Sequence, residues 1–361
     1  MIIKRLDLMN FRNYETLSLE PGSGTNILYG DNAQGKTNVL ESIYMCSAAR
    51  SHRASRDREL IRFDAEEAHI KMLVDKHDSE YRIDMHLKKN KSKGIAVNGI
   101  PIRKISELFG IVNIIFFSPE DLNLVKKGPS ERRRFIDFEL CQLDKVYTNH
   151  LMNYNKVLAE RNRLLKDMAF TPELSNTLSV WDGQLAAYGE AVMSDRTRFV
   201  GQLNQVMREL HYTLTGGKEQ IEIVYEPDVI EGSFEKEIQR SMDRDMRQHV
   251  TCRGPHRDDI CFLVNGIDIR RYGSQGQQRT AALSLKLSEI QLVRQLIRDT
   301  PVLLLDDVLS ELDSSRQMQL LATIKDIQTF ITCTGLDEFV NCRFPIDSLF
   351  EVSAGTAVRK N

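Results

Sequence analysis

The sequence predicts an α/β protein with mixed sheets around a phosphate-binding loop, joined to a second, mostly helical lobe that contains a short antiparallel helical hairpin. Three observations support this prediction. A glycine-rich loop at residues 30–37 lies between a strand-like and a helix-like segment. Two long stripes of apolar residues with helical spacing follow in the middle of the chain. The length of 361 residues also exceeds what one hydrophobic core usually organises, which favours two lobes.

The loop reads Gly30-Asp-Asn-Ala-Gln-Gly-Lys-Thr37, and an apolar run at 25–29 precedes it. Its glycines allow tight turns that bring backbone N–H groups close to phosphate oxygens. Lys36 adds a positive charge at the β- and γ-phosphates, and the Thr37 hydroxyl can ligate Mg²⁺. The alternative, a plain glycine turn at the surface, is disfavoured because a strand and an amphipathic helix flank the loop. The sequence therefore predicts a nucleotide site here.

Composition limits the function classes. The 49 Lys and Arg residues are balanced by 51 Asp and Glu, so binding to nucleic acid would require a local basic patch. The six cysteines include no C-x-x-C pair and no zinc-finger spacing, which indicates reduced thiols in a cytosolic protein. The chain shows no signal peptide at its start and no apolar run of bilayer length. We therefore expect a cytoplasmic protein without a membrane partner.

In the N-terminal third, alternating apolar residues predict a hairpin over 2–19 that leads to the phosphate loop. Residues 68–74 and 81–87 alternate cleanly about a turn at 76–79, and a turn at Asn98-Gly99 follows. They predict a small antiparallel sheet. Residues 111–117 form a nearly continuous apolar run, which predicts a buried strand.

Three basic clusters lie at residues 50–58, 88–93 and 126–134. Clusters of this kind are either solvated surface segments or contacts to the phosphates of DNA, and both readings stay open.

The helical lobe is predicted from two stripes. The first runs from Tyr147 to Met168, with Arg161 in one seam position, and is expected to end near Pro172. The second runs from Trp181 to Leu210 and slips once around Asp195-Arg196. Joined by a short loop, the two helices should fold back on each other as a hairpin.

Beyond the hairpin we expect a strand at 221–225, a helix at 234–249 and a β-hairpin at 260–269. A strong helix at 280–298 follows Ser274-Gln-Gly-Gln-Gln-Arg279, which is either a polar helix cap or a second anion site. Apolar strands are expected at 301–307 and 330–334. The predicted domains are 1–120 and 251–361, which form the two parts of the head, and 121–250, the helical insert.

The strand at 301–307 ends in Asp306 and Asp307. Because Mg²⁺ on the β- and γ-phosphates requires a carboxylate opposite Thr37, this strand and the phosphate loop should share one sheet. Asp306 is the predicted magnesium ligand with Thr37, and Asp307 is placed to orient or deprotonate the attacking water. The alternative is that both acids simply cap residues 310–313.

The order of these motifs resembles the RecF family of recombination mediators, within the ABC/SMC-type ATPases. The resemblance covers nearly the whole chain. Its further motifs are Asn10-Phe-Arg-Asn-Tyr14, Phe117-Ser-Pro-Glu-Asp-Leu122, Arg132-Arg-Arg-Phe-Ile-Asp137, Gly254-Pro-His-Arg-Asp-Asp259 and Gly273-Ser-Gln-Gly-Gln-Gln-Arg-Thr280.

The resemblance implies an ABC-type ATPase head with a Walker A loop, a Walker B Asp306, an ABC signature at 274–279 and a D-loop at 310–313. It implies ATP and Mg²⁺ as cofactors. The residues it assigns to ATP are Arg12, Gly30, Asp31, Asn32, Ala33, Gln34, Gly35, Lys36, Thr37, Ser274, Gly276 and Gln277. In such ATPases the signature serine contacts the ATP held by the other subunit.

The implied function is ATP-dependent DNA binding in DNA repair and replication. ATP would drive formation of a homodimer on double-stranded or gapped DNA, slow hydrolysis would release it, and RecR, with RecO and RecA, would act with it to load recombinase. Two departures from the wider ABC pattern should slow hydrolysis. Asp307 stands where a catalytic Glu is usual, and Thr334 stands near the position of the switch His. No Gln occupies the Q-loop region, so Glu120 is only a candidate there.

The alternative function is the ATPase subunit of a membrane transporter, which shares the Walker and signature motifs. The insert of roughly a hundred helical and basic residues argues against it. A small-molecule kinase would leave the motif at 274–279 without a role.

Overall fold

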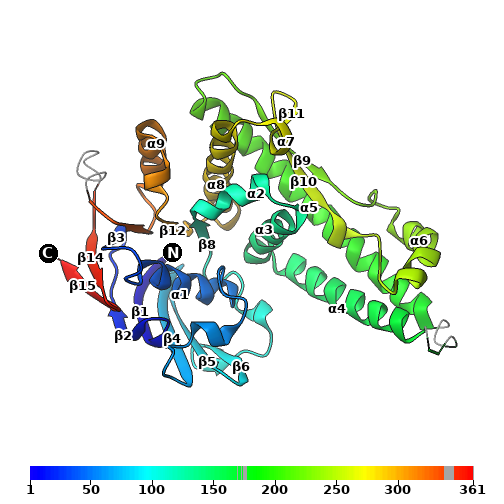
Figure 1. Ribbon diagram of the computed structural model, residues 1–361, viewed down its shortest axis with the longest axis horizontal. Coiled ribbons are helices and arrows are strands. Elements are labelled where there is room, and N and C mark those ends of the chain that lie inside the picture. The colour runs from blue at the N-terminus through cyan, green and yellow to red at the C-terminus, as the bar shows by residue number, and fades with distance from the viewer. Residues whose placement is uncertain (169, 172, 174–176, 337–344, 361) are drawn as a thin grey trace. The chain divides into compact units, whose positions relative to one another are not determined.

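The computed structural model describes residues 1–168, 170–171, 173, 177–336 and 345–360. The chain forms two compact units (Figure 1). Unit 1 comprises Met1–Asp121 with Lys286–Asn361, and unit 2 comprises Leu122–Leu285. The second division therefore falls at 285, whereas the sequence places it at 250. The reason is that the strand at 221–226 pairs with the one at 259–264, which holds residues beyond 250 in unit 2.

Unit 1 contains a six-stranded sheet with the order β15-β14-β3-β13-β12-β8. All neighbouring strands are parallel except the antiparallel pair β14 and β15. Strands β3, β13, β12 and β8 are mainly apolar and almost fully buried, as expected for a sheet covered on both faces. Their bounds are β3 Thr25–Tyr29, β8 Ile114–Phe117, β12 Val302–Asp306, β13 Thr329–Cys333, β14 Ser348–Ser353 and β15 Thr356–Lys360.

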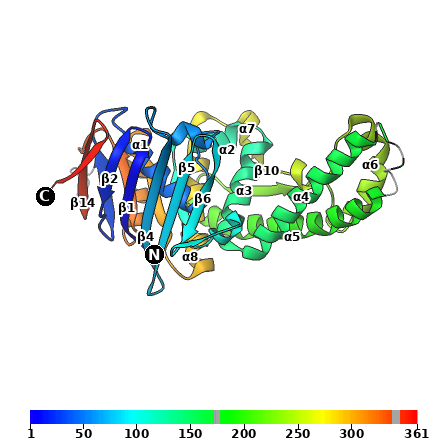
Figure 2. The same cartoon turned by 90° about the horizontal axis from the view of Figure 1, so that it is seen from below.

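The second sheet of unit 1 is antiparallel, with the order β2-β1-β4-β5-β6-β7 (Figure 2). The predicted N-terminal hairpin and the predicted small sheet are therefore one structure. His77 and Asp78 make the β4–β5 turn, and both have positive φ, as tight hairpin turns require. The bounds are β1 Ile2–Phe11, β2 Tyr14–Leu19, β4 Glu67–Lys76, β5 Ser79–Lys88, β6 Lys91–Val97 and β7 Ile100–Pro101.

Helix α1, Lys36–Ala48, contacts both sheets: β4 on one side and β8, β12 and β13 on the other. The sequence predicts an amphipathic helix here, and that detail is wrong: the helix is buried on all sides and lacks a clean amphipathic stripe. Gln328, which is 2% exposed, joins the sheets a second time. Its side-chain amide donates to the Ile3 carbonyl at 2.9 Å and accepts from the Ile3 N–H at 2.7 Å.

Unit 2 is mostly helical, and α4 and α5 run side by side along its length (Figures 1 and 2). The predicted helical hairpin is thus present. Helix α4 ends at Asp167, and its expected end near Pro172 lies outside the described residues. The helices are α2 Leu122–Lys126, α3 Pro129–Leu143, α4 Lys145–Asp167, α5 Leu178–Leu214, α6 Phe234–Gln248 and α7 Ile269–Tyr272.

Helix α8, Gln275–Ile297, crosses the division between the units, and α9, Ser314–Ile324, belongs to unit 1. Unit 2 also has a small antiparallel sheet of β9 Ile221–Glu226, β10 Asp259–Val264 and β11 Ile267–Asp268. Short 3-10 turns lie at Asp57–Leu60, Ile105–Glu107, Pro119–Asp121, Pro255–Arg257 and Leu309–Glu311.

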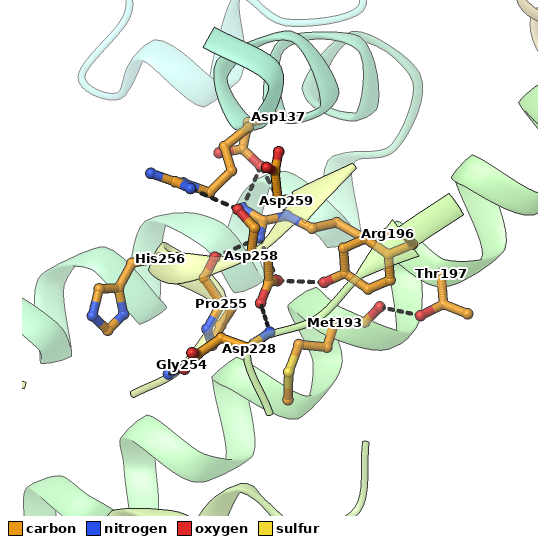
Figure 3. A network of polar contacts seen from close by, with 12 residues as sticks. Asp137, Met193, Arg196, Thr197, Asp228, Gly254, Pro255, His256, Asp258 and Asp259 are labelled. Carbon is orange, nitrogen blue, oxygen red and sulfur yellow. Dashed lines mark hydrogen bonds and ion pairs between the residues drawn. The ribbon is translucent and has the colours of Figure 1, made fainter. Parts of the chain in front are cut away.

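Arg161 and Arg196 explain the two irregularities in the apolar stripes. Arg161 is fully buried, and it contacts Asp182 and Asp245 at 2.7 Å each. Arg196 is the centre of the network in Figure 3. A buried charge is tolerated only when it is paired and hydrogen-bonded, so both positions are polar nodes within an apolar seam.

The Arg196 guanidinium donates to Asp137 Oδ1, Asp258 Oδ2 and the Pro255 carbonyl at 2.7 to 2.8 Å. The Tyr225 hydroxyl and the Asp228 N–H also donate hydrogen bonds to the Asp258 carboxylate. Two of these groups, the Pro255 carbonyl and Asp258, lie in the Gly254-Pro-His-Arg-Asp-Asp259 motif (Figure 3). The motif is therefore part of the interior of unit 2.

Of the five described cysteines, four are buried. Burial raises the pKa of the Cys261 thiol to about 11. Cys342 lies outside the described residues. Within the part of the chain that the structure describes, every helix is too short or too polar to cross a membrane.

Candidate nucleotide-binding site

The phosphate loop needs its two glycines. Gly30 has φ 150° and Gly35 has φ 117°, both outside the range that other residues adopt readily. A Cβ at Gly30 would collide with the Val352 carbonyl oxygen, and one at Gly35 would lie 2.6 Å from the Asn13 side-chain amide. Residues 31–33 between them are exposed. The loop is thus tightly packed at its ends and open at its tip.

Neighbouring segments hold Gln34 in place. Its carbonyl accepts from the Asn13 side chain at 2.8 Å, and its side-chain oxygen accepts from the Ala354 N–H at 2.7 Å. Ala354 lies in the turn of the C-terminal β14–β15 hairpin, for which no sequence prediction was made. Alternation over 348–352 followed by Gly355 was the signal that could have found it.

Lys36 is 7% exposed, and its ammonium donates to the carbonyls of Gly30 at 2.5 Å and Asp31 at 2.8 Å. An ammonium has three N–H donors, and these two contacts account for two of them. The positive charge is therefore held within the loop by these two carbonyls. This is the arrangement that an anionic phosphate chain requires.

The structure brings Thr37 and Asp306 together. The Thr37 hydroxyl donates to Asp306 Oδ1 at 2.8 Å, and the Thr332 hydroxyl donates to the same oxygen at 2.8 Å. The contact exists because β3, β13 and β12 are parallel neighbours, so their carboxyl ends meet at one edge of the sheet. The predicted shared sheet is thus present. The sequence analysis assigned no role to Thr332. Its position one residue before the end of β13 was the signal that could have placed it at the site.

Asp307 follows β12 with a φ of 53°, an uncommon conformation that concentrates at functional sites. Its N–H donates to Thr332 Oγ1 at 3.0 Å, and its carbonyl accepts from the Ser310 hydroxyl at 2.8 Å. Thr334 is exposed one residue beyond β13. Of the acids near the D-loop, Asp313 rather than Asp307 caps α9, accepting from the Arg316 N–H at 3.0 Å.

Arg12 faces a carboxylate in this structure. It forms a two-pronged pair with Glu41, with both N···O distances 2.8 Å, and donates to the Glu59 carbonyl at 2.9 Å. Burial would raise the pKa of Glu41, but Arg12 and the Ser51 hydroxyl outweigh it and hold that pKa below its usual range. The pair anchors the start of the basic segment at 50–58. Contact between Arg12 and a nucleotide stays a prediction.

His52 lies in that segment with its ring centroid 4.2 Å from Phe116 and 5.3 Å from Tyr44. Burial lowers its pKa to about 4, although Glu41 and Asp306 act in the opposite direction. The imidazole is therefore neutral at physiological pH. His52 therefore adds no positive charge to the cluster at 50–58.

The signature segment at 274–279 begins α8 with a capping box. Ser274 Oγ accepts from the Gln277 N–H at 3.2 Å, and Gln277 Oε1 accepts from the Ser274 N–H at 3.0 Å. Ser274 and Gly276 are exposed. Within a single chain, this segment therefore acts as a polar helix cap. Because these N-terminal N–H groups are at the surface, the anion-site reading stays open.

The three basic clusters differ in exposure. In 50–58 all four arginines are exposed. In 88–93 three lysines form ion pairs with acids. Lys88 lies 3.4 Å from Glu67, Lys89 lies 2.9 Å from Glu66 and Lys93 lies 2.9 Å from Asp57. In 126–134 Arg132 is 1% exposed and forms a two-pronged pair with Asp259. A DNA contact by Arg132 is therefore ruled out by its burial, which a count of basic residues could not reveal.

The Q-loop candidate Glu120 is exposed in the turn that follows β8. Its neighbour Asp121 accepts from the Ser118 N–H at 2.8 Å and lies 3.7 Å from the Lys286 ammonium. Burial raises the pKa of Asp121, and Lys286 offsets this only in part. The structure gives no preference for Glu120 as a metal-sensing group.

A strand–loop–helix phosphate site that faces a strand-terminal aspartate across a parallel sheet defines a phosphate-loop NTPase head. Residues 2–355 match the family described as RecF/RecN/SMC N terminal domain. The chain belongs to this family.

Close relatives share the whole length. The chain is 60% identical to the DNA replication and repair protein RecF of Lachnospira eligens, with 100% of both chains covered. It is 59% identical to that of Lachnoclostridium phytofermentans, with 99% of both covered. A solved structure of the recombination mediator protein RecF with ATP in the RecFOR pathway is similar at a TM-score of 0.93 and 36% identity, covering 100% of this chain and 98% of that one.

A Pyrococcus furiosus Smc head domain bound to the C-terminal domain of ScpA has a TM-score of 0.57 at 17% identity, covering 99% of this chain and 96% of that one. At this identity the likeness concerns the fold alone. It agrees with the predicted ABC/SMC-type head.

Proposed function

We propose that the protein is an ATP-dependent, DNA-binding recombination mediator of DNA repair and replication, located in the cytoplasm. One observation carries the proposal: the Thr37 hydroxyl meets Asp306 at 2.8 Å beside an ammonium held inside the loop. A charged loop next to a hydroxyl–carboxylate pair suits a magnesium nucleotide. The full-length likeness to RecF structures described with ATP and with ATPγS supports ATP as that nucleotide.

Magnesium fits the residues present. Thr37 and Asp306 offer hard oxygen donors, which Mg²⁺ prefers, and they are close enough to share one ion with the phosphates. The ion would neutralise phosphate charge. Lys36 and the loop N–H groups would orient the phosphates, Asp307 would orient or deprotonate the attacking water, and Thr334 would lie at the switch position.

ATP is proposed to join two copies of the chain. The exposed capping box of Ser274 and Gln277, with Gly276 between them, presents a helix N-terminus that can meet the γ-phosphate held by the partner copy. Hydrolysis would be slow and DNA-stimulated, so that ATP acts as a switch. The relatives' RecFOR context supports RecR as partner, with RecO and RecA acting in the same process. The transporter alternative is not supported, because the relatives that match over the full length are DNA repair proteins.

Asp307→Asn is expected to bind ATP normally and to hydrolyse it at least about 100-fold more slowly, because the amide keeps the shape of the side chain but loses the basic oxygen. ATP-dependent dimers should then persist. Single-turnover hydrolysis and sedimentation in ATP and Mg²⁺ measure the two effects. Hydrolysis at the parental rate would place the base elsewhere.

DNA binding is expected to depend steeply on salt despite the net charge of −2, because a local patch would carry it. Replacing exposed Arg53 and Arg56 with Glu should reduce the slope of log affinity against log salt by about two, with equal loss on every DNA sequence. Lys236→Glu with Arg240→Glu is the matched control, since it makes the same change in net charge on α6. An equal loss of DNA affinity in both double variants would show that overall charge, and not the cluster at 50–58, determines DNA binding.

A further inference from the structure

On the exposed face of the antiparallel sheet, His69 of β4 and His86 of β5 lie directly opposite each other in the strand register. Their rings are stacked, with centroids 4.1 Å apart and planes inclined by 22°. Residues alternate between faces along both strands, so the neighbours Ala68, Ile70 and Leu87 point into the core while the two imidazoles face outward. Two adjacent strands thus hold two metal-binding side chains together.

Glu67 adds a carboxylate to the pair. Its Oε2 lies 2.9 Å from His86 Nε2, and its Oε1 lies 3.7 Å from His69 Nε2. One ligand atom from each of the three residues lies within 4.8 Å of the others. The hydrogen bond from His86 holds the pKa of Glu67 below its usual range, so the carboxylate is ionised. The side chains are 45%, 38% and 35% exposed, so an ion can reach them.

The strands on either side leave this position open. Gly94 of β6 stands opposite His86 and has no side chain to cover it. Met9 of β1 stands opposite His69 and is 41% exposed. The row therefore offers two imidazoles, a carboxylate and a nearby thioether without a bulky residue over them.

We propose that Glu67, His69 and His86 form a surface site for a borderline divalent transition metal ion, with Zn²⁺ as its preferred occupant. Two imidazole nitrogens and one carboxylate oxygen are a ligand set for zinc and its neighbours, whereas Mg²⁺ and Ca²⁺ select oxygen donors. A tetrahedral ion with bonds of about 2.1 Å separates its ligands by about 3.4 Å, which small rotamer changes can reach from the present spacing. Three protein ligands leave the fourth position to water.

Lys88 is the competing cation. Its ammonium lies 3.4 Å from the same Glu67 Oε2 that accepts from His86. Metal binding would replace this exposed ion pair and remove the bridging proton between Glu67 and His86. Such exposed pairs are weak, so the replacement is favourable for an ion with three good ligands. Lys88→Gln should therefore tighten Zn²⁺ binding.

The test is Zn²⁺ titration of the full chain in competition with a chromophoric chelator, without nucleotide. We expect one high-affinity ion per chain and about 100-fold weaker binding after His69→Asn or His86→Asn. His77→Asn is the matched control, because His77 is exposed at the turn of the same hairpin but outside the cluster, and Asn tolerates its positive φ. Circular dichroism checks that each variant is folded.

Co²⁺ provides a second readout. We expect the visible absorption of a tetrahedral ion, lost in His86→Asn, without the near-ultraviolet band of thiolate ligation. Binding that is unchanged in both His69→Asn and His86→Asn, a thiolate band, or a loss of affinity in His77→Asn as large as in those two variants would overturn the proposal. Because Lys36→Ala should leave Zn²⁺ binding intact, failure here is separable from failure of the ATP site.

Discussion

Lys36→Ala is expected to abolish ATP binding and, with it, ATP-dependent dimerisation. The ammonium is the one side-chain charge inside the described phosphate loop that can neutralise the β- and γ-phosphates. Hydrogen bonds to charged groups contribute about 1.5–3 kcal/mol each, so losing two of them should weaken ATP binding by about 100-fold or more. Equilibrium binding of a fluorescent ATP analogue and sedimentation with and without ATP and Mg²⁺ measure both effects.

Lys36→Met separates the charge from the packing of the buried stem, because methionine keeps an unbranched chain of similar length. It should lose ATP binding to the same degree as Lys36→Ala. If the methionine variant binds ATP normally, the lysine acts through the packing of its buried stem and its charge has no role. Dimers that still form with ATP in either variant would contradict the phosphate-loop assignment.

Arg196→Met is expected to reduce the stability of unit 2 by about 3–5 kcal/mol, the cost of leaving buried charges without their partner. Arg196 is 2% exposed and joins Asp137 of α3, Asp258 and the Pro255 carbonyl to α5 (Figure 3). Methionine preserves most of the volume, so the loss reports on the uncompensated carboxylates. Hydrogen exchange in α5 and β10, together with denaturant unfolding, measures it.

Arg198→Met is the control for that change. Arg198 lies two residues away on the same helix, is 61% exposed and pairs with Asp195 at the surface. Exposed pairs contribute about 0–1 kcal/mol, so this variant should unfold almost as the parent does. A comparable loss in both variants would mean that helix propensity or net charge, and not the buried network, determines the stability.

Local patterns predicted much of the fold. Alternation found the antiparallel strands, helical spacing found α4 and α5, and the loop pattern with a strand ending in Asp306 placed both on one sheet. These features are set by residues close together in the chain. The closeness of Thr37 and Asp306 was predictable because Mg²⁺ bound to the β- and γ-phosphates requires a carboxylate opposite the Thr37 hydroxyl.

What the sequence could not predict depends on distant partners. Arg132 and Arg196 look like surface charges until Asp259 and Asp258, more than 60 residues away, are brought to them. Arg12 similarly finds Glu41, and the phosphate loop is supported by a turn at the far end of the chain. Charge counts along a sequence carry no information on burial, so the basic cluster at 126–134 was overestimated.

The central claim is that ATP joins two copies through the phosphate loop of one and the signature of the other. Ser274→Arg should bind ATP but fail to dimerise, since a bulky cation replaces a small donor at the interface. Lys36→Ala spoils its own loop, so in a mixed dimer with Ser274→Arg both lesions fall on one site. The second site then has a parental loop facing a parental signature.

The decisive measurement is ATP hydrolysis by each variant alone and by their mixture, with circular dichroism showing that both proteins are folded. Cooperation across the interface predicts no activity from either variant alone and recovery on mixing, with about half of the sites in each mixed dimer active. Absence of recovery from the two folded proteins would contradict a signature that acts on the partner's ATP.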